Sequence, residues 1–455
     1  MASWSDQIET LIAPALARST ATQAVVIGPG VLAKVGEVAR SVTDAPSALV
    51  CADAAGFAAA GPATVQSLTA AGFDTQTLIL PCDPLPKASV EEAEPFRQLL
   101  AADPDLFPVS VGSGVMNDLV KWAAFETDRR YLTAATAASM DGYTSAGAPL
   151  AQTGFKVTIP TRAPVAMVAD LDVIAAAPAE MNGWGYGDLA GKVPAGGDWI
   201  LADALGVEPI DAVAWPLVQD HLPGWLAGPE GIAAGDPDAV ARLFIGLTAV
   251  GFAMEFHGTS RPASGADHQI AHMWEMQGLT HLGQKVSHGA AVAVGCVTAL
   301  SLFDWLLQQD LDGLDSQAVA RNAPTLNTRE TALREVIPEP TIAEKAVGEL
   351  RAKHSMPNIH AERLEQLRRV WPDLRTRLTT NLMRADEMAT MLRGAGAPHH
   401  PAQIGVSVEH LLKTLRAAAY IRRRYTIFDV LHETGLTEQA FAAVTARLGP
   451  QEAAE

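Results

Sequence analysis

The apolar residues of this chain change their spacing near residue 178, and that change constrains the fold more than any other feature. Before this point, short apolar runs alternate with helical patterns, which is typical of parallel strands joined by helices. After it, long helical patterns replace the strands. A chain of 455 residues is also too long for one ordinary core. We therefore predict an α/β domain over residues 1–178 and an all-helical domain over residues 179–455.

The α/β part contains six segments that we expect to form strands. They are AVVIGPG (24–30), SALVCAD (47–53), TQTLILP (75–81), LFPVSVGSG (106–114), RRYLTAATA (129–137) and APVAMVADLD (163–172). Helical patterns occupy VLAKVGEVAR, EEAEPFRQLLAAD and VMNDLVKWAAFETD. The stretch TAATAASMDGYTSAGAP (133–149) is rich in small and hydroxyl residues. It fits either the lining of a ligand groove or a flexible loop.

The composition disfavours several classes of protein. A net charge of −18 disfavours nucleic acid and anionic membranes as main partners, and an anionic substrate would need a local basic pocket. The cysteines Cys51, Cys82 and Cys296 show no CxxC spacing, which fits a reducing cytoplasm. The N-terminus lacks the pattern of a signal peptide, and we expect no apolar run of the ~20 residues that a membrane span needs. These features predict a cytoplasmic enzyme or binding protein.

Three histidines and an aspartate could form a metal site. His268 and His272 are four residues apart in ADHQIAHMWEM, so on a helix they project from one face toward a common centre. His288 and Asp188 could complete a site of nitrogen and oxygen ligands. The alternative is that these are ordinary structural histidines, because HxxxH is not rare in a chain with 12 histidines. HExxH is absent, which disfavours a zincin-type protease.

A glycine turn and an acidic residue could hold a dinucleotide. SVGSGVMNDLVK places Gly112, Ser113 and Gly114 between a strand and a helix, where glycines admit a ligand and the helix N-terminus offers N–H groups to phosphate. Asp53 ends the second strand, where a ribose hydroxyl is commonly held, and this favours NAD over NADP. The alternatives are an ordinary turn and a helix cap at Asp53. IGPGVLAKVG does not meet GxGxxG, so an ordinary Rossmann enzyme is a poor match.

The motifs taken in order resemble those of a known family. GSGVMNDLVK, TAASMDGYTS, GFKVTIP, GYGDLAGK, SRPASGADHQIAH and SHGAAVAVG resemble the sn-glycerol-1-phosphate dehydrogenases. That family lies within the superfamily of iron-containing alcohol dehydrogenases, glycerol dehydrogenases and dehydroquinate synthases. The resemblance covers roughly residues 20–300, with weaker similarity in RGAGAPHHPAQIG and RRRYTIFDVLHETG. It implies a dehydroquinate synthase-like fold, with a nucleotide-binding α/β domain followed by an all-helical domain.

The resemblance also implies roles for individual residues. The metal ligands would be Asp188, His268 and His288, so that His272 becomes a neighbour of the metal and a candidate for proton transfer. Asp141 would contact the substrate, and we expect Lys156 and Arg261 to bind its phosphate; the alternative for both cations is a surface salt bridge. The residues expected to bind the cofactor are Asp53, Gly112, Ser113, Gly114, Asp118, Thr136 and Ser139.

The implied reaction is hydride transfer from NADH or NADPH to dihydroxyacetone phosphate, giving sn-glycerol 1-phosphate. A divalent zinc, nickel or iron ion would polarise the carbonyl. The alternatives are another iron-type alcohol or glycerol dehydrogenase, a dehydroquinate-synthase-like sugar-phosphate cyclase, and a non-catalytic binding protein. We expect a homo-oligomer, a dimer or larger, with no nucleic-acid or membrane partner.

Overall fold

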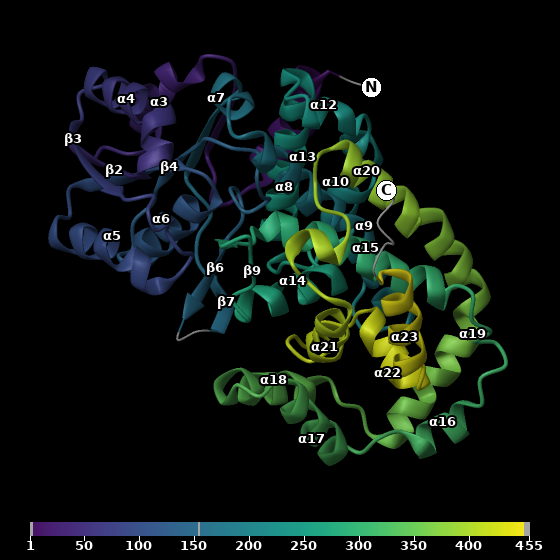
Figure 1. Ribbon diagram of the computed structural model, residues 1–455. Helices are drawn as coiled ribbons and strands as arrows, with labels where there is room; N and C mark the ends of the chain where they lie inside the picture. Colours follow the sequence, from purple (N-terminus) through teal and green to yellow (C-terminus); the bar gives the residue numbers. More distant parts are fainter. Residues whose placement is uncertain (1–2, 153–154, 450–455) are drawn as a thin grey trace. The chain divides into compact units, whose positions relative to one another are not determined.

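The computed structural model describes residues 3–152 and 155–449, and its backbone forms two compact units (Figure 1). The first unit contains the chain up to Leu189 together with Val213–Pro262 and Gly394–Gly396. The second contains Ala190–Ala212, Ala263–Arg393 and the chain from Ala397 onward. The chain thus passes between the units several times. A single boundary between residues 178 and 179 stays a prediction.

Six parallel strands form the sheet of the first unit, in the order β1-β8-β5-β4-β2-β3. Every strand overlaps one of the predicted segments. Both faces of the sheet are buried, because Val50 and Val109 pack on one side while Leu49 and Cys51 pack on the other. The strands are β1 (Ala24–Gly28), β2 (Ser47–Asp53), β3 (Asp74–Leu80), β4 (Leu106–Gly112), β5 (Leu132–Ala135) and β8 (Ala166–Asp170).

Helices cover both faces of this sheet (Figure 1). Side chains of α3 and α4 belong to one core cluster, and those of α5 and α6 belong to the other. The helical segments of the first unit are α1 (Trp4–Gln7), η1 (Ile8–Ile12), α2 (Ala13–Arg18), η2 (Val31–Lys34), α3 (Val35–Val42), α4 (Ala54–Ala70), α5 (Val90–Ala102), α6 (Gly114–Glu126), α7 (Leu171–Ala175), α8 (Ala179–Ala190), α10 (Ala214–Gln219), α11 (Leu222–Leu226), α12 (Pro229–Ala233) and α13 (Pro237–His257).

One hairpin of the first unit was not among the expected strands. β6 (Gly147–Gln152) pairs with β7 (Phe155–Pro160) in an antiparallel ladder, with Ala148 opposite Ile159. The residues between β5 and β6 form neither helix nor strand. The stretch 133–149 is therefore a strand end, a connecting segment and the start of a hairpin.

Glycines let helix α8 approach the segment that follows β5. A Cβ atom on Gly185 would lie 1.8 Å from the carbonyl oxygen of Ala138, a distance that no side chain could occupy. Helix α8 ends at Ala190, and α9 (Lys192–Ala204) starts a new helix. Pro194 lies in the first turn of α9, where its missing N–H removes no helical hydrogen bond. The glycines and the proline in this stretch are thus compatible with two successive helices.

The second unit is helical apart from a short two-stranded ladder. Helix α14 packs against α15 and α21, and α9 packs against α19. Its elements are α9, α14 (Ala266–Met276), β9 (Thr280–His281), β10 (Gln284–Lys285), α15 (His288–Leu306), α16 (Ser316–Asn322), α17 (Leu326–Val336), α18 (Pro340–Lys353), α19 (Pro357–Asn381), most of α20 (Ala385–Gly394), η3 (Pro401–Ile404), α21 (Val408–Ala418), α22 (Ile427–Thr434) and α23 (Thr437–Arg447).

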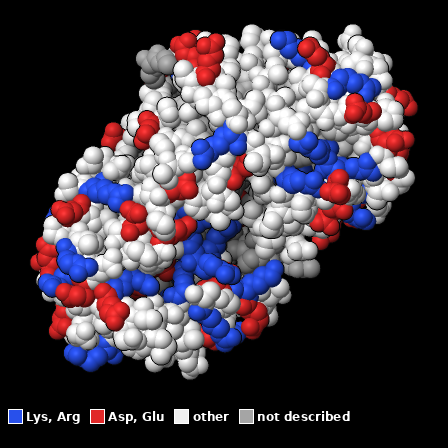
Figure 2. Space-filling model, turned by 180° about the vertical axis from the view of Figure 1, so that it is seen from behind, with Lys and Arg blue, Asp and Glu red and all other residues white. Residues whose placement is uncertain are grey.

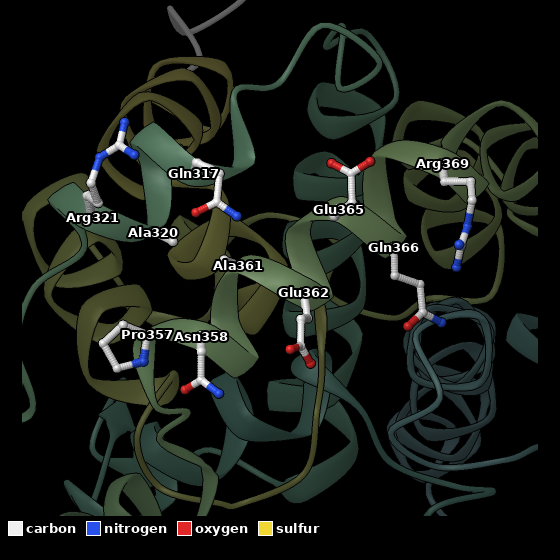
Figure 3. A pocket seen from close by; sticks show the side chains of 10 residues that line it. All are labelled: Gln317, Ala320, Arg321, Pro357, Asn358, Ala361, Glu362, Glu365, Gln366 and Arg369. Atoms are coloured by element: carbon white, nitrogen blue, oxygen red, sulfur yellow. The ribbon is translucent and has the colours of Figure 1, made fainter.

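A surface cavity of about 520 Å³ lies between α16 and the first half of α19 (Figure 3). Its walls carry two arginines and two glutamates, so their charges balance and do not favour an anion. The residues that line it are Gln317, Ala320, Arg321, Pro357, Asn358, Ala361, Glu362, Glu365, Gln366 and Arg369.

Two helices are long and apolar enough to cross a membrane by length and composition alone, although the sequence predicted no run of that length. They are α13 and α15, and 78% and 89% of their apolar windows are buried inside the structure. Such burial is the property of core helices.

Candidate metal and nucleotide site

Three histidine rings lie together within the second unit. His268 and His272 project from successive turns of α14, and His288 is the first residue of α15. The ring centroids are 5.8 Å apart for His268 and His272, 5.4 Å for His268 and His288, and 5.8 Å for His272 and His288. The structure therefore brings together the three histidines that the sequence singled out.

Carboxylates determine which nitrogen of two of these rings carries a proton. The Nδ1 atom of His268 contacts Oδ2 of Asp267, and Nδ1 of His288 lies 2.6 Å from Oε1 of Glu275. An ionised carboxylate only accepts hydrogen bonds, so each Nδ1 carries the hydrogen that it donates. In a neutral imidazole the Nε2 atom is then unprotonated, which is the form that binds a metal.

His272 has the opposite arrangement. Nη2 of Arg422 donates to its Nδ1 atom over 3.0 Å. A guanidinium has donors and no acceptor, so Nδ1 of His272 must accept and Nε2 carries the proton in the neutral ring. The three histidines thus divide into two that suit metal ligation through Nε2 and one that presents an N–H group.

The N-terminus of α14 is fixed by a buried carboxylate. Asp198 on α9 accepts hydrogen bonds from the backbone N–H of Ala266 over 2.7 Å and from that of Ile427 over 2.6 Å. These are the first residues of α14 and α22, where helical N–H groups need partners. Asp198 therefore ties the helix that carries His268 and His272 to the segment that carries Arg422.

Within the second unit, three described residues that include His272 could in principle share a metal ion. His272, Glu275 and His288 each offer a ligand atom, and these atoms lie within 4.8 Å of one another. The hydrogen bonds above disfavour this set, because Nδ1 of His272 accepts from Arg422 and Glu275 accepts from His288. Imidazole donors oriented by carboxylates suit a divalent zinc, nickel or iron ion, so the residues present fit the predicted metal.

Asp188 and Asp141 are linked within the first unit. Asp188 lies on α8 and is fully buried, and its Oδ2 atom accepts from the backbone N–H of Asp141 over 3.1 Å. A carboxylate that is fully removed from water requires compensating partners. This contact fixes the position of the Asp188 side chain relative to the segment that follows β5.

The predicted cofactor residues gather at the carboxyl edge of the sheet. Gly112 and Asp53 end the neighbouring strands β4 and β2. A Cβ atom on Gly56 would lie 3.0 Å from Cα of Gly112, so the start of α4 approaches the end of β4 closely. Thr136 follows β5, and its N–H donates to the carbonyl of Gly112 over 3.1 Å. Ligands of parallel α/β sheets bind at this edge.

Asp53 caps helix α4, which is the alternative role that the sequence allowed for it. Its Oδ1 atom accepts from the N–H of Gly56 over 2.6 Å at the start of α4.

Ser113 immediately precedes α6, and its side chain makes no capping hydrogen bond. Gly114 is tightly packed, since a Cβ atom there would lie 2.6 Å from Cγ of Met140. Ser139 lies beside Met140 in the same segment and is buried.

Asp118 forms a buried ion pair with a structural role. Nζ of Lys121 lies 3.5 Å from Oδ1 of Asp118 and donates to the carbonyls of Gly142 and Gly147 over 2.7 and 3.0 Å. Burial lowers the pKa of Lys121, and the charge of Asp118 opposes that shift. The pair therefore fastens helix α6 to the connecting segment between β5 and β6.

The two cations predicted to bind phosphate are placed differently. Arg261 is fully buried near the end of a chain segment of the first unit. Lys156 belongs to β7, and its side chain lies outside the described residues. Figure 2 shows lysine and arginine side chains gathered in more than one place on the face it displays, although the chain carries a net charge of −18.

Sequence reasoning missed the groups that orient the histidines. Asp267, Glu275 and Arg422 were assigned no role, although each makes a hydrogen bond to one of the three rings. The sequence does place three arginines together at 422–424, in a stretch for which only weak family similarity was noted. That segment lies in the turn between α21 and α22.

Comparison with known structures identifies the class of fold. A probable glycerol dehydrogenase from Sinorhizobium meliloti 1021 superposes with a TM-score of 0.59 at 17% identity, over 94% of this chain and 97% of that one. Glycerol dehydrogenase from Schizosaccharomyces pombe gives 0.58 at 17%, over 95% and 93%. Residues 26–178 match the iron-containing alcohol dehydrogenase family. The fold is thus that of the iron-type dehydrogenases, and the predicted fold class is confirmed.

Sequence relatives narrow this class. A glycerol-1-phosphate dehydrogenase [NAD(P)+] of Methanothrix thermoacetophila is 32% identical over 69% of this chain and 86% of its own length. The enzyme of the same name from Bacillus subtilis (strain 168) is 29% identical over 85% and 84%. This chain belongs to the glycerol-1-phosphate dehydrogenase [NAD(P)+] family. The predictions of an NAD(P)-dependent oxidoreductase and of a divalent metal cofactor are confirmed.

Proposed function

We propose that this chain reduces dihydroxyacetone phosphate to sn-glycerol 1-phosphate, with NADH or NADPH as the hydride donor. The relatives that bear the name of this activity support the choice of a polyol phosphate as substrate. The observation that carries the proposal is the division of the three histidines into two that suit a metal and one that presents an N–H group. Both functions stabilise the negative charge that develops on a carbonyl oxygen during hydride transfer.

In this proposal the metal ligands are Asp188, His268 and His288. A bound divalent cation would act as a Lewis acid on the carbonyl oxygen while the nicotinamide supplies hydride. Asp267 and Glu275 hold the two imidazoles in the tautomer that ligation requires. Asp188 would bind the metal through its carboxylate, which the N–H group of Asp141 orients.

His272 would act on the substrate oxygen. Its Nε2–H group can donate a hydrogen bond to the carbonyl oxygen, which gains negative charge as the carbonyl carbon accepts hydride. The oxygen finally takes a proton that reaches it from water through this hydrogen-bonded position. A neutral imidazole in this role stabilises the developing charge without itself carrying a net charge.

The remaining predicted residues would bind the dinucleotide and the rest of the substrate. Backbone N–H groups at Ser113 and Gly114 begin α6 and suit the pyrophosphate. Asp53 would hold the ribose hydroxyls, with Asp118, Thr136 and Ser139 beside the same edge. Asp141 would contact a substrate hydroxyl, and Arg261 and Lys156 would bind the phosphate.

The proposed setting follows from the same chemistry. The substrate and product are small, charged and water-soluble, so we propose a cytoplasmic enzyme with no nucleic-acid or membrane partner. We also propose a homo-oligomer, a dimer or larger. Sedimentation of the purified protein would measure the assembly directly, and a monomer at micromolar concentration would contradict it.

The test is NADH oxidation with a panel of carbonyl compounds after loading with Zn²⁺, Ni²⁺ or Fe²⁺. We expect turnover with dihydroxyacetone phosphate to exceed that with dihydroxyacetone and simple aldehydes in kcat/KM. The product should be inert toward an enzyme specific for sn-glycerol 3-phosphate. Absence of turnover with the phosphorylated ketone under every metal would rule out the proposal. A preference for dihydroxyacetone would instead indicate a glycerol dehydrogenase.

A further inference from the structure

The turn between α21 and α22 is tied to the start of α14 by several hydrogen bonds within the second unit. Nη1 of Arg424 donates to the carbonyl of Ser264, just before α14 begins. Oγ1 of Thr426 donates to Oε1 of Gln269 over 3.3 Å. Asp198 joins the first N–H groups of α14 and α22. These contacts hold the chain that carries Arg422 at a fixed place beside the histidines.

Arg422 and Arg423 are adjacent in this turn but have different partners. Arg423 is exposed, and its Nε and Nη2 atoms each lie 3.0 Å from the carboxylate of Glu349. Arg422 is half-buried and donates instead to Nδ1 of His272 over 3.0 Å. Hydrogen bonds from a guanidinium to a carboxylate are the stronger kind, and Arg423 makes two of them with Glu349. Arg422 differs from its neighbour because its guanidinium contacts a ring nitrogen.

The direction of this hydrogen bond has a chemical consequence. The guanidinium stays protonated and cannot accept, so it requires an unprotonated Nδ1 on His272. The alternative neutral tautomer would have an unprotonated Nε2 and could ligate a metal. His272, Glu275 and His288 already offer ligand atoms within 4.8 Å of one another, so a competing metal position is within reach.

We propose that Arg422 is a positioning residue that holds His272 in the tautomer with the proton on Nε2. In this form His272 donates a hydrogen bond to the substrate oxygen and stays out of the metal's ligand set. The inference rests on the proposed function for the identity of the substrate, but the tautomer and the ligand set are properties of the site itself. They can be measured without any turnover.

The first test measures the tautomer. We would record ¹⁵N spectra of the zinc-loaded, full-length protein labelled in histidine, with His272 assigned by its loss in His272→Ala. We expect an unprotonated Nδ1 and a protonated Nε2 in the wild type, and a shift toward the other tautomer in Arg422→Ala. Arg422→Lys should keep the wild-type pattern because an ammonium also only donates. A protonated Nδ1 at His272 in the wild type would overturn the proposal.

The second test measures the ligand set with Co²⁺ in place of the native metal. In Arg422→Ala we expect His272 to join the metal, which raises the coordination number and weakens the visible d–d bands. Removing the ring as well, in the double variant with His272→Ala, should restore the wild-type spectrum. Arg423→Ala is the matched control, because its side chain is exposed and paired with Glu349, and its spectrum should be unchanged. Identical spectra for Arg422→Ala and the wild type would contradict the proposal.

Kinetics separate this role from phosphate binding. Arg422→Ala should lower kcat by about 10- to 100-fold, as is usual for groups that orient a metal-site histidine, with little change in the KM for dihydroxyacetone phosphate. The double variant should lose no more than His272→Ala alone, and Arg422→Lys should recover part of the activity. A selective rise in the KM for the phosphorylated ketone over dihydroxyacetone would assign Arg422 to the phosphate and overturn the proposal. If the wild type reduces no polyol phosphate, the proposed function fails while the two spectroscopic tests still decide the inference.

Discussion

The two units of this protein build their ligand-binding groups in different ways. In the first unit, the chain approaches itself through glycines: Gly56 of α4 lies against Gly112 at the end of β4, and Gly185 of α8 lies against Ala138. In the second unit, side chains orient one another, as when Glu275 holds His288 and Arg422 holds His272. Close backbone approach would let N–H groups reach a pyrophosphate, whereas oriented side chains would suit a metal and a reacting carbonyl.

This difference determines how each unit should respond to mutation. A substitution at a close backbone approach meets steric overlap, which is insensitive to pH and affects stability first. A substitution in the histidine group removes a hydrogen bond or a ligand, which affects chemistry first. The largest expected effect therefore lies in the second unit.

Replacing His288 or His268 by alanine should reduce kcat/KM by at least about 10³-fold. The metal contribution to stabilising charge in the transition state is several kcal/mol, and either loss would remove it. Metal content by mass spectrometry should fall in parallel with activity. His410→Ala is the matched control, because His410 is a half-buried histidine of the same unit whose ring contacts the side chain of Gln277. Full activity in His288→Ala would exclude this residue from the metal site.

In the first unit, Gly185→Ala should lower the free energy of unfolding by about 1 to 3 kcal/mol, the usual cost of overpacking. The added Cβ would meet the Ala138 carbonyl at 1.8 Å, and backbone atoms on both sides cannot give way cheaply. Urea unfolding followed by fluorescence measures this cost, which should be the same at pH 6 and pH 8.

Gly224→Ala is the control for this prediction. Apart from its chain neighbours and its own helix backbone, no described atom lies within 4 Å of a Cβ atom at Gly224, which also belongs to a helix of the first unit. This substitution should leave the unfolding curve unchanged or slightly improved. An equal loss in both variants would mean that the close approach at Gly185 has no special cost.

The difference between the units also explains what the sequence could predict. Strands and glycine turns leave local patterns, so all six sheet strands overlap predicted segments, and Asp53, Gly112 and Thr136 follow or end neighbouring strands. The hairpin of β6 and β7 was missed because GAPLAQ contains glycine and proline and shows little alternation.

The orienting groups of the second unit leave no such pattern. His272 and Arg422 are 150 residues apart, and their contact depends on how α14 and the turn before α22 pack. Spacing alone suggested His268 and His272 as a ligand pair, and only the resemblance separated their roles. The hydrogen bonds at their Nδ1 atoms now give an independent physical reason for that separation.

Stability should depend on pH through the second unit. His432, on α22, has its pKa lowered to about 3 by burial and by the charges of Arg329 and Lys353. The unfolded chain takes up this proton near pH 6.5 while the folded chain does not, so stability falls as pH falls below 6.5 and stops falling near 3. Between pH 6.5 and 5 we expect a loss on the order of 1 to 2 kcal/mol from this group.

His432→Gln should flatten this part of the pH dependence, whatever its effect on stability at pH 8. The measurement is the slope of the unfolding free energy between pH 6.5 and 5, compared between the variant and the wild type. Gly185→Ala provides the contrast, because it should shift the whole curve down and leave the slope intact. Equal slopes for His432→Gln and the wild type would contradict the assignment.

The smallest expected effect concerns the cofactor and separates the two roles of Asp53. Asp53→Asn keeps an oxygen that can cap α4 through the N–H of Gly56 but removes the charge that would repel a 2′-phosphate. We expect the ratio of kcat/KM for NADPH over NADH to rise roughly 10-fold with little change in Tm, since about 1.4 kcal/mol of repulsion corresponds to that factor. Asp53→Ala should shift the ratio similarly and also lose about 1 kcal/mol of stability with the cap. If the ratio is unchanged in both variants and only Asp53→Ala loses stability, Asp53 acts as a helix cap alone. The preference for NADH or NADPH would then depend on the backbone of the glycine turn.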